Sequence, residues 1–173
     1  MDVLEAVKGR RSIRAFKNRD VPAEIVEKLI EAARWAPSAG NIQPWEFIIV
    51  RKPKIKRRLV EAALDQVFIE EAPVVIVVCA NEVRSSQGYG VRGETLYCIQ
   101  DTAAATQNIH LTAYSLGLGT CWVGAFREEE AREILKIPRG IRPVAILPVG
   151  YPAEAPIPRM RKSISQIVHY ETF

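Results

Sequence analysis

Three segments of the chain carry side chains whose types and spacing suit ligand binding. In the first, residues 10–14 (RRSIR), three guanidinium groups flank one hydroxyl. Guanidinium groups bind phosphate oxygens in bidentate fashion, and a hydroxyl adds one further donor. A second basic pair, Arg159 and Arg161, lies near the C-terminus. Clustered cations of this kind predict a phosphate site, and a solvated basic surface is the alternative for either cluster alone.

The second segment, residues 37–45 (PSAGNIQPW), is dense in amide and hydroxyl groups. It leaves a predicted helix and enters an apolar strand, so it can present donors and acceptors to a heteroaromatic ring. Ordinary turn chemistry is the alternative, because Ser, Gly, Asn and Pro favour turns by themselves.

The third segment, residues 117–124 (GLGTCWVG), contains three glycines that allow the backbone to approach a flat ligand closely. Its glycine spacing does not fit a dinucleotide-binding fingerprint, and it lacks the Gly-Lys-Ser/Thr element of a P-loop. Trp122 is the tryptophan that we expect to contact the ligand. His110 and His169 are interpreted as structural residues, and no catalytic triad is evident.

Length and composition limit the class of protein. The chain has 173 residues, 48% of them hydrophobic and 25% charged, which is typical of a soluble globular domain. The longest apolar run, residues 72–80, is too short to span a bilayer, and the N-terminus lacks the apolar core of a signal peptide. Three cysteines without metal-ligand spacing indicate buried free thiols and no metal site, so we expect a cytoplasmic protein that does not bind membranes.

The net charge of +4 does not by itself indicate a nucleic-acid-binding protein. Fifteen of the 24 basic residues nevertheless fall into three short windows, residues 8–19, 51–58 and 159–162. We considered residues 51–58 as a surface that follows a nucleic-acid backbone. The absence of interleaved aromatic residues argues against it, so no nucleic-acid partner is expected.

Apolar periodicity and turn residues predict a single α+β domain over residues 1–173, without internal repeats. The uniformly apolar segment 74–80 indicates a strand covered on both faces. Residues 81–92 are predicted to form a polar loop that serves as a lid. Pro148 lacks the ladder N–H, so its strand is expected to be at an edge or bulged there. The predicted helices are residues 2–9, 22–36, 54–66, 94–116 and 127–136, and the predicted strands are 45–51, 74–80, 120–124 and 144–149; residues 152–158 are expected to be extended.

Five motifs in this order resemble the FMN-dependent nitroreductase family, also called the nitroreductase/NADH oxidase family. They are RRSIRAF, APSAGNIQPWEF, EAPVVIVV, QDTAAATQNIHLTAYSLGLGTCWVGAF and PRMRKSISQIVHY, and together they cover nearly the whole chain. The resemblance implies the nitroreductase fold, with a central mixed or antiparallel sheet flanked by helices. It also implies an intertwined homodimer with FMN at the subunit interface.

The resemblance also implies roles for individual residues. It implies that Arg10, Arg11, Ser12 and Arg14 bind the ribityl phosphate of FMN, and that Arg159 and Arg161 bind the same phosphate from the C-terminal end of the chain. The loop that covers the flavin from the opposite subunit corresponds to Pro37, Ser38 and Asn41. Trp122, Val123 and Gly124 lie beside the flavin, with the backbone N–H of Val123 near N5. Gln66 is the candidate for the pyrimidine edge, since the Asn/Lys pair of larger members is not found.

The implied activity is an oxidoreductase in which NAD(P)H reduces the flavin and a nitroaromatic, quinone or similar small molecule then reoxidises it by a ping-pong mechanism. The chemistry is carried by the flavin and needs no catalytic side chain. Alternatives are a flavin-fragmenting or reductively dehalogenating relative on the same fold, and a flavin-binding protein without turnover. The chain is short for the family, so an open, undiscriminating site is expected.

Overall fold

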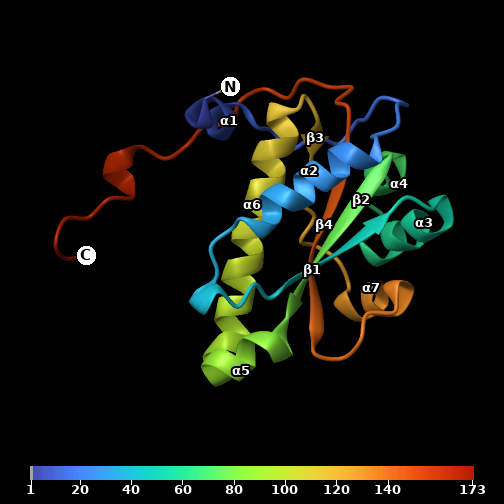
Figure 1. The fold of residues 1–173 in the computed structure, drawn as a ribbon. Coiled ribbons are helices and arrows are strands. Elements are labelled where there is room, and N and C mark those ends of the chain that lie inside the picture. Colours follow the sequence, from blue (N-terminus) through green and yellow to red (C-terminus); the bar gives the residue numbers. More distant parts are fainter. Residues whose placement is uncertain (1) are drawn as a thin grey trace.

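The computed structural model describes residues 2–173 and is built around one four-stranded antiparallel sheet (Figure 1). Its strand order is β1-β2-β4-β3, and helices flank both faces. The predicted α+β class with a helix-flanked sheet is therefore confirmed, and the sheet is antiparallel throughout. The strands are β1 Trp45–Val50, β2 Val74–Asn81, β3 Gly119–Thr120 and β4 Ile141–Gly150.

Strand β2 is the centre of the sheet, and its side chains alternate between two hydrophobic cores. Val74, Ile76 and Val78 face one core, whereas Val75 and Val77 face the other, and all five are fully buried. Successive residues of a strand point to opposite faces, so a strand buried on both sides is apolar at every position. The prediction that this segment is covered on both faces is confirmed.

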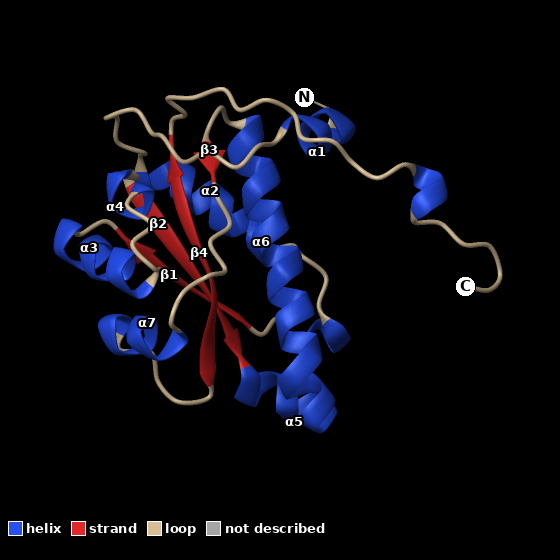
Figure 2. Ribbon diagram, turned by 180° about the vertical axis from the view of Figure 1, so that it is seen from behind, coloured by secondary structure: helices blue, strands red, loops and turns tan. Residues whose placement is uncertain are grey.

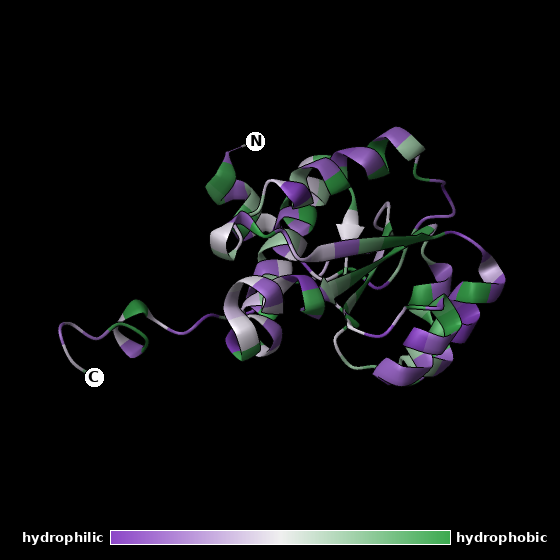
Figure 3. Ribbon diagram, turned by 60° about the horizontal axis from the view of Figure 1, so that its bottom comes forward, coloured by the Kyte–Doolittle hydropathy of each residue, from purple (hydrophilic) through white to green (hydrophobic). Residues whose placement is uncertain are grey.

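Helices α2 (Ala23–Arg34) and α6 (Cys98–Ser115) cover the first face. Each contributes a stripe of apolar residues three or four positions apart, such as Leu29 of α2 and Ile109 of α6, both buried. The second face is covered by α3 (Pro53–Ala62), α4 (Phe68–Glu71) and α7 (Glu128–Leu135), as Figure 2 shows from behind. Figure 3 shows hydrophobic strands between helices that alternate in polarity.

Residue 81 ends β2 and residues 82–92 form a helix, so the predicted lid loop is wrong. Helix α5 (Glu82–Arg92) begins at Asn81, whose side chain accepts a hydrogen bond from the amide of Arg84 at 2.9 Å. Ser85 is its only buried residue. Periodicity did not predict this helix because a helix with so little buried surface has no apolar stripe.

The long helix predicted over 94–116 is divided in two. A π-helical turn (Gly93–Tyr97) precedes α6, and Gly117 follows its end in the left-handed region with φ 75°. The predicted glycine stop is confirmed. Helix α3 ends earlier than predicted, because Leu64 and Asp65 both have positive φ, 57° and 60°.

Strand β4 lies between β2 and β3, so the predicted edge position of Pro148 is wrong. The amide of Cys121 donates to the Pro148 carbonyl at 3.4 Å, but Pro148 has no N–H to return the bond. The ladder is therefore interrupted after Thr120, which shortens the predicted strand 120–124, and pairing resumes between Val123 and Ile146 in the same register. The register shift of the sheet is at Val78/Cys79 and not at Pro148.

The remaining elements are one short helix, two 3-10 turns and the irregular C-terminal segment. Helix α1 (Val3–Gly9) precedes residues 10–14, and a short 3-10 turn, η1 (Ala39–Asn41), follows α2. Residues 152–158 are irregular, as predicted, and the C-terminal arm (residues 155–173) projects from the body with one 3-10 turn, η3 (Ile164–Gln166) (Figure 1). Among residues 2–173, no helix combines the length and apolarity needed to cross a bilayer.

Candidate functional site

The backbone of residues 10–14 is fixed beside the free edge of β3. Ser12 forms a parallel bridge with Thr120, and the amide of Ile13 donates to the Thr120 carbonyl at 3.0 Å. Ile13 is buried beneath this pairing, whereas Arg14 is exposed. The sheet edge thus holds the backbone, while the three arginine side chains of the segment line a cavity beside it.

The chain brings the two predicted phosphate-binding segments to one cavity of about 390 Å³. Five of its lining residues are arginines, which we call the arginine cluster, and Ser12 and Glu154 lie among them. Within residues 2–173, no carboxylate lies within 4.0 Å of these five guanidinium groups to form an ion pair, whereas Arg51, Arg57 and Arg142 each have one. The arginine cluster consists of Arg10, Arg11, Arg14, Arg159 and Arg161.

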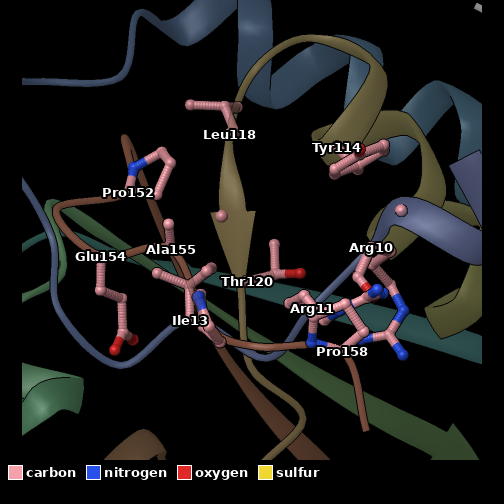
Figure 4. Close-up of a pocket in the computed structure, with 13 residues that line it drawn as sticks. Arg10, Arg11, Ile13, Tyr114, Leu118, Thr120, Pro152, Glu154, Ala155 and Pro158 are labelled. Carbon is pink, nitrogen blue, oxygen red and sulfur yellow. The ribbon is translucent and has the colours of Figure 1, made fainter.

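A second cavity, also of about 390 Å³, shares Arg10, Arg11, Glu154 and Pro156 with the first. Its remaining walls are mainly apolar and include Ile13 and Leu118. Figure 4 shows Glu154 on the opposite side of Ile13 from the two arginines. The site therefore combines a cationic end with an apolar wall, a combination that suits an amphipathic ligand.

The residues of the first cavity fit a phosphate group. Guanidinium groups and a hydroxyl are the donors that phosphate oxygens require, and cations without acid partners lose no ion pair when they bind one. Glu154 is the single carboxylate in the cavity, and its oxygen accepts from the backbone amides of Arg14 and Ala15. FMN, the cofactor implied by the sequence resemblance, carries such a group at the end of its ribityl chain.

A buried histidine supports the edge of the site, as the sequence interpretation of a structural His110 requires. His110 Nδ1 lies 2.6 Å from Thr120 Oγ1, and its ring stacks on Trp122 with centroids 5.9 Å apart. Burial, and secondly the charge of Arg10, lower the pKa of His110 to about 4. The imidazole is therefore neutral at pH 7 and backs the half-exposed indole of Trp122.

The expected role of the Val123 amide is corrected by the sheet register. The N–H of Val123 donates to the carbonyl of Ile146 at 3.0 Å, so it points into the sheet and away from any ligand. N–H groups of consecutive strand residues point in opposite directions, so the amide of exposed Gly124 points away from β4. Gly124 is therefore the better candidate for a backbone donor to the flavin.

Gln66 lies beside this segment, but its donors are already in use. Its side-chain nitrogen donates to the carbonyls of Ala63 at 2.9 Å and Ala125 at 3.1 Å, which leaves only the amide oxygen free. Helix α4, which begins two residues after Gln66, contacts the arginine cluster, since the guanidinium carbon of Arg14 lies 5.8 Å from the centroid of the Phe68 ring. Gln66 thus has an acceptor, and no donor, to offer a ligand.

The loop at residues 37–43 is held at the other end of α6. The amide of Ala39 donates to Asp101 Oδ1 at 3.2 Å, and burial raises the pKa of that carboxyl. Within the loop, Gln43 donates to Ser38 Oγ at 3.0 Å and to Asn41 Oδ1 at 3.2 Å. Its shape is therefore fixed before any ligand arrives.

Within one chain, the loop at residues 37–43 and the arginine cluster lie apart. Asp101 contacts the loop and His110 contacts Thr120. The nine residue steps of α6 from Asp101 to His110 correspond to about 14 Å along the helix axis. The structure thus gathers Arg10, Arg11, Ser12, Arg14, Arg159 and Arg161 at one cavity, and leaves Pro37, Ser38 and Asn41 elsewhere. Sequence reasoning missed the contact made by Glu154, which no local motif marks, and gave no role to Thr120 and Asp101, although both lie within the quoted motifs.

Comparisons with known proteins agree with this architecture. A sequence model described as the Nitroreductase family matches residues 7–71 and 65–151. An NADH dehydrogenase of Thermus thermophilus is 33% identical over 195 aligned positions, which cover 97% of this chain and 95% of the relative. An FMN reductase (NADPH) of Bacillus subtilis is 29% identical and covers 99% of this chain and 74% of its own length.

Solved structures show the same fold. The NfrA1 nitroreductase of B. subtilis superposes with a TM-score of 0.89 at 29% identity, over 99% of this chain and 74% of that one. The NADPH:FMN oxidoreductase of Vibrio harveyi, complexed with NAD⁺, gives a TM-score of 0.91 at 24% identity over 99% and 77%. The fold is the α+β fold that these reductases share. The chain belongs to the nitroreductase family.

Proposed function

We propose that the protein is an FMN-dependent oxidoreductase that takes its electrons from NAD(P)H. The observation that carries this proposal is the arginine cluster, in which five guanidinium groups from both ends of the chain line one cavity without an acid partner among residues 2–173. Relatives named FMN reductase (NADPH) and NADH dehydrogenase support the choice of cofactor and reductant.

In this proposal the arginine cluster and Ser12 hold the ribityl phosphate. The backbone N–H of Gly124 faces flavin N5, and Trp122, supported by His110, lies beside the ring system. Gln66 offers its free amide oxygen to the pyrimidine edge. FMN, when bound, supplies a site that accepts a hydride and releases electrons to an acceptor. The chain itself orients the cofactor and shields it from water.

The proposed active unit is a homodimer. Pro37, Ser38 and Asn41 lie at the far end of α6 from the arginine cluster, which supports a role over the flavin of the partner subunit. The C-terminal arm exposes apolar side chains that a partner subunit can bury. They include Ile157 at 85% exposure, Ile164 at 74% and Ile167 at 59%.

The proposed acceptors are nitroaromatics, quinones or similar small molecules, reduced by a ping-pong mechanism. A single helix, α5, and one π-helical turn stand where larger insertions would narrow a site, which supports an open pocket that discriminates little. Reductant and acceptor would then occupy the same place in turn.

Spectroscopy of the purified protein tests the proposal. We expect flavin absorption, bleaching by NADH or NADPH without oxygen, and recovery of the colour when a quinone is added. Steady-state rates should give parallel double-reciprocal lines, as ping-pong kinetics require. A protein that shows no affinity for FMN would contradict the cofactor, and intersecting lines would contradict the mechanism only.

A further inference from the structure

The root of the C-terminal arm is tied to the segment that follows the arginines. The amide of Lys17 donates to the Tyr151 carbonyl at 2.8 Å, and the amide of Ala153 donates to the Ala15 carbonyl at 2.9 Å. A bridge between Phe16 and Pro152 lies between these two bonds. Residues 151–153 therefore run antiparallel to residues 15–17.

Glu154 forms the last of these ties. One of its carboxylate oxygens accepts from the amide of Ala15 at 3.1 Å and also from the amide of Arg14. Beyond it, the hydrogen bonds described for residues 155–173 all stay within the arm. The side chain of Glu154 is thus the final fixed point before Arg159 and Arg161.

The position of Glu154 bears on the arginine cluster directly. It lines the same cavity as all five arginines, yet no guanidinium lies within 4.0 Å of it in the described chain. Its hydrogen-bond partners are backbone amides, so Glu154 occupies none of the guanidinium donors, although Arg11 and Arg161 each donate from one nitrogen to nearby backbone carbonyls. A carboxylate that served only to neutralise the arginines would pair with one of them.

We propose that Glu154 is a positioning residue of the phosphate site, which anchors the arm to the backbone of Arg14 and Ala15 and so holds Arg159 and Arg161 opposite Arg10. This inference rests on the proposed function. Its charge acts against its anchoring role, because a carboxylate near a phosphate repels it. The two effects have opposite signs and can be separated by substitution.

The substitutions Glu154→Gln and Glu154→Ala separate the anchoring effect from the charge effect. Both remove the negative charge, but only glutamine keeps an oxygen that can accept from the two amides. Affinities of the flavin-free protein for FMN and for riboflavin, which lacks the phosphate, are measured by flavin fluorescence. Their ratio reports the phosphate contacts and is insensitive to a general loss of ring binding. Glu24→Gln, on the exposed surface of α2, is the matched charge control.

We expect Glu154→Gln to keep or raise the preference for FMN over riboflavin, and Glu24→Gln to leave it unchanged. Glu154→Ala should lower the preference about tenfold, the size of one charge-assisted contact. Hydrogen exchange of the flavin-free protein gives a second readout. Amides in a peptide spanning residues 11–17 should exchange faster in Glu154→Ala than in the wild type, with Glu154→Gln close to the wild type.

Equal ratios in the two Glu154 variants, or unchanged exchange in Glu154→Ala, would overturn the inference while the phosphate site stands. A wild-type protein that binds riboflavin as tightly as FMN would overturn the phosphate site and the inference with it. Thermal unfolding of both variants shows whether a lowered ratio reflects loss of the fold.

Discussion

Two regions of the molecule carry runs of basic residues with similar density, but they use their charge differently. In the run at residues 51–58, which we call the α3 run, Arg51 pairs with Asp20 at 2.9 Å and Arg57 with Glu70 at 2.8 Å. Lys56 is buried and donates to two backbone carbonyls, at 2.8 and 2.6 Å. In the arginine cluster, no such acid partner occurs among residues 2–173.

The comparison shows that the density of charge along a sequence does not identify a binding site. The partners that neutralise the α3 run come from other parts of the chain, with Asp20 31 residues before Arg51 and Glu70 13 residues after Arg57. The arginine cluster is assembled over a still longer separation, but from residues of one sign. Unpaired cations that converge on a cavity mark a ligand site, whereas paired cations stabilise the fold.

Removing the arm should have the largest effect. A chain that ends after Gly150 loses Arg159, Arg161 and the Glu154 anchor, so we expect FMN affinity to fall more than about hundredfold. A chain that ends after Lys162 keeps these groups and should retain FMN while losing the apolar end of the arm. Flavin occupancy and sedimentation distinguish the two, and retention of FMN by the shorter chain would contradict our account.

Single substitutions in the arginine cluster should have the next largest effect. Arg10→Ala or Arg161→Ala removes one charge-assisted contact, worth about 1.5–3 kcal/mol, and should weaken FMN binding about tenfold to hundredfold. Equilibrium titration of the flavin-free variants measures this directly. Unchanged affinity in either variant would exclude that arginine from the site.

Acid should destabilise the protein through His110, which lies next to the arginine cluster. Its folded pKa of about 4 lies below the ordinary 6.5, so the unfolded chain binds a proton that the folded chain does not between these values. The stabilisation is complete above pH 6.5 and is lost as the pH falls towards 4. We expect the free energy of unfolding to be about 2 kcal/mol lower at pH 5 than at pH 7 from this group.

Urea titrations of the wild type and His110→Leu at both pH values measure that contribution. The variant should have a lower free energy of unfolding at pH 7 but a smaller loss on acidification, and His169→Gln serves as the exposed control. Equal losses in wild type and His110→Leu would show that His110 is not the group responsible.

The α3 run should give the smallest effect on the cofactor. Arg57→Ala removes an exposed guanidinium whose partner is Glu70, and FMN affinity should stay within about twofold of the wild type. The pKa of Glu70, which the Arg57 hydrogen bond lowers, should rise in this variant. A large fall in FMN affinity would contradict the claim that only the arginine cluster, and not the α3 run, binds the cofactor.

The sequence predicted well those features that rest on local pattern. Strand β2 was evident because burial on both faces requires an apolar residue at every position, and Gly117 marked the end of α6. The segments that form the arginine cluster were singled out because their order and residue types match one family; the structure brings them to one cavity, and their role in phosphate binding stays a prediction. Conformation that depends on distant partners was not predicted.

Three failures show where local pattern gives no signal. Helix α5 has almost no buried face, so no apolar stripe marked it. The Val123 amide was assigned to a ligand, but sheet register directs it to Ile146, and register is a property of two strands. The hydrogen bond from the Arg14 amide to Glu154 joins residues 140 positions apart, and no local motif predicts it.

Binding of FMN and riboflavin to the flavin-free wild-type protein tests the central claim most directly. The two ligands share the ring system and differ in the phosphate, so the difference in affinity isolates the arginine cluster. We expect FMN to bind at least about hundredfold more tightly at low salt, since several charge-assisted contacts act together, with the advantage shrinking as salt is added. Equal affinities for the two ligands would contradict the assignment of these five arginines to a phosphate site.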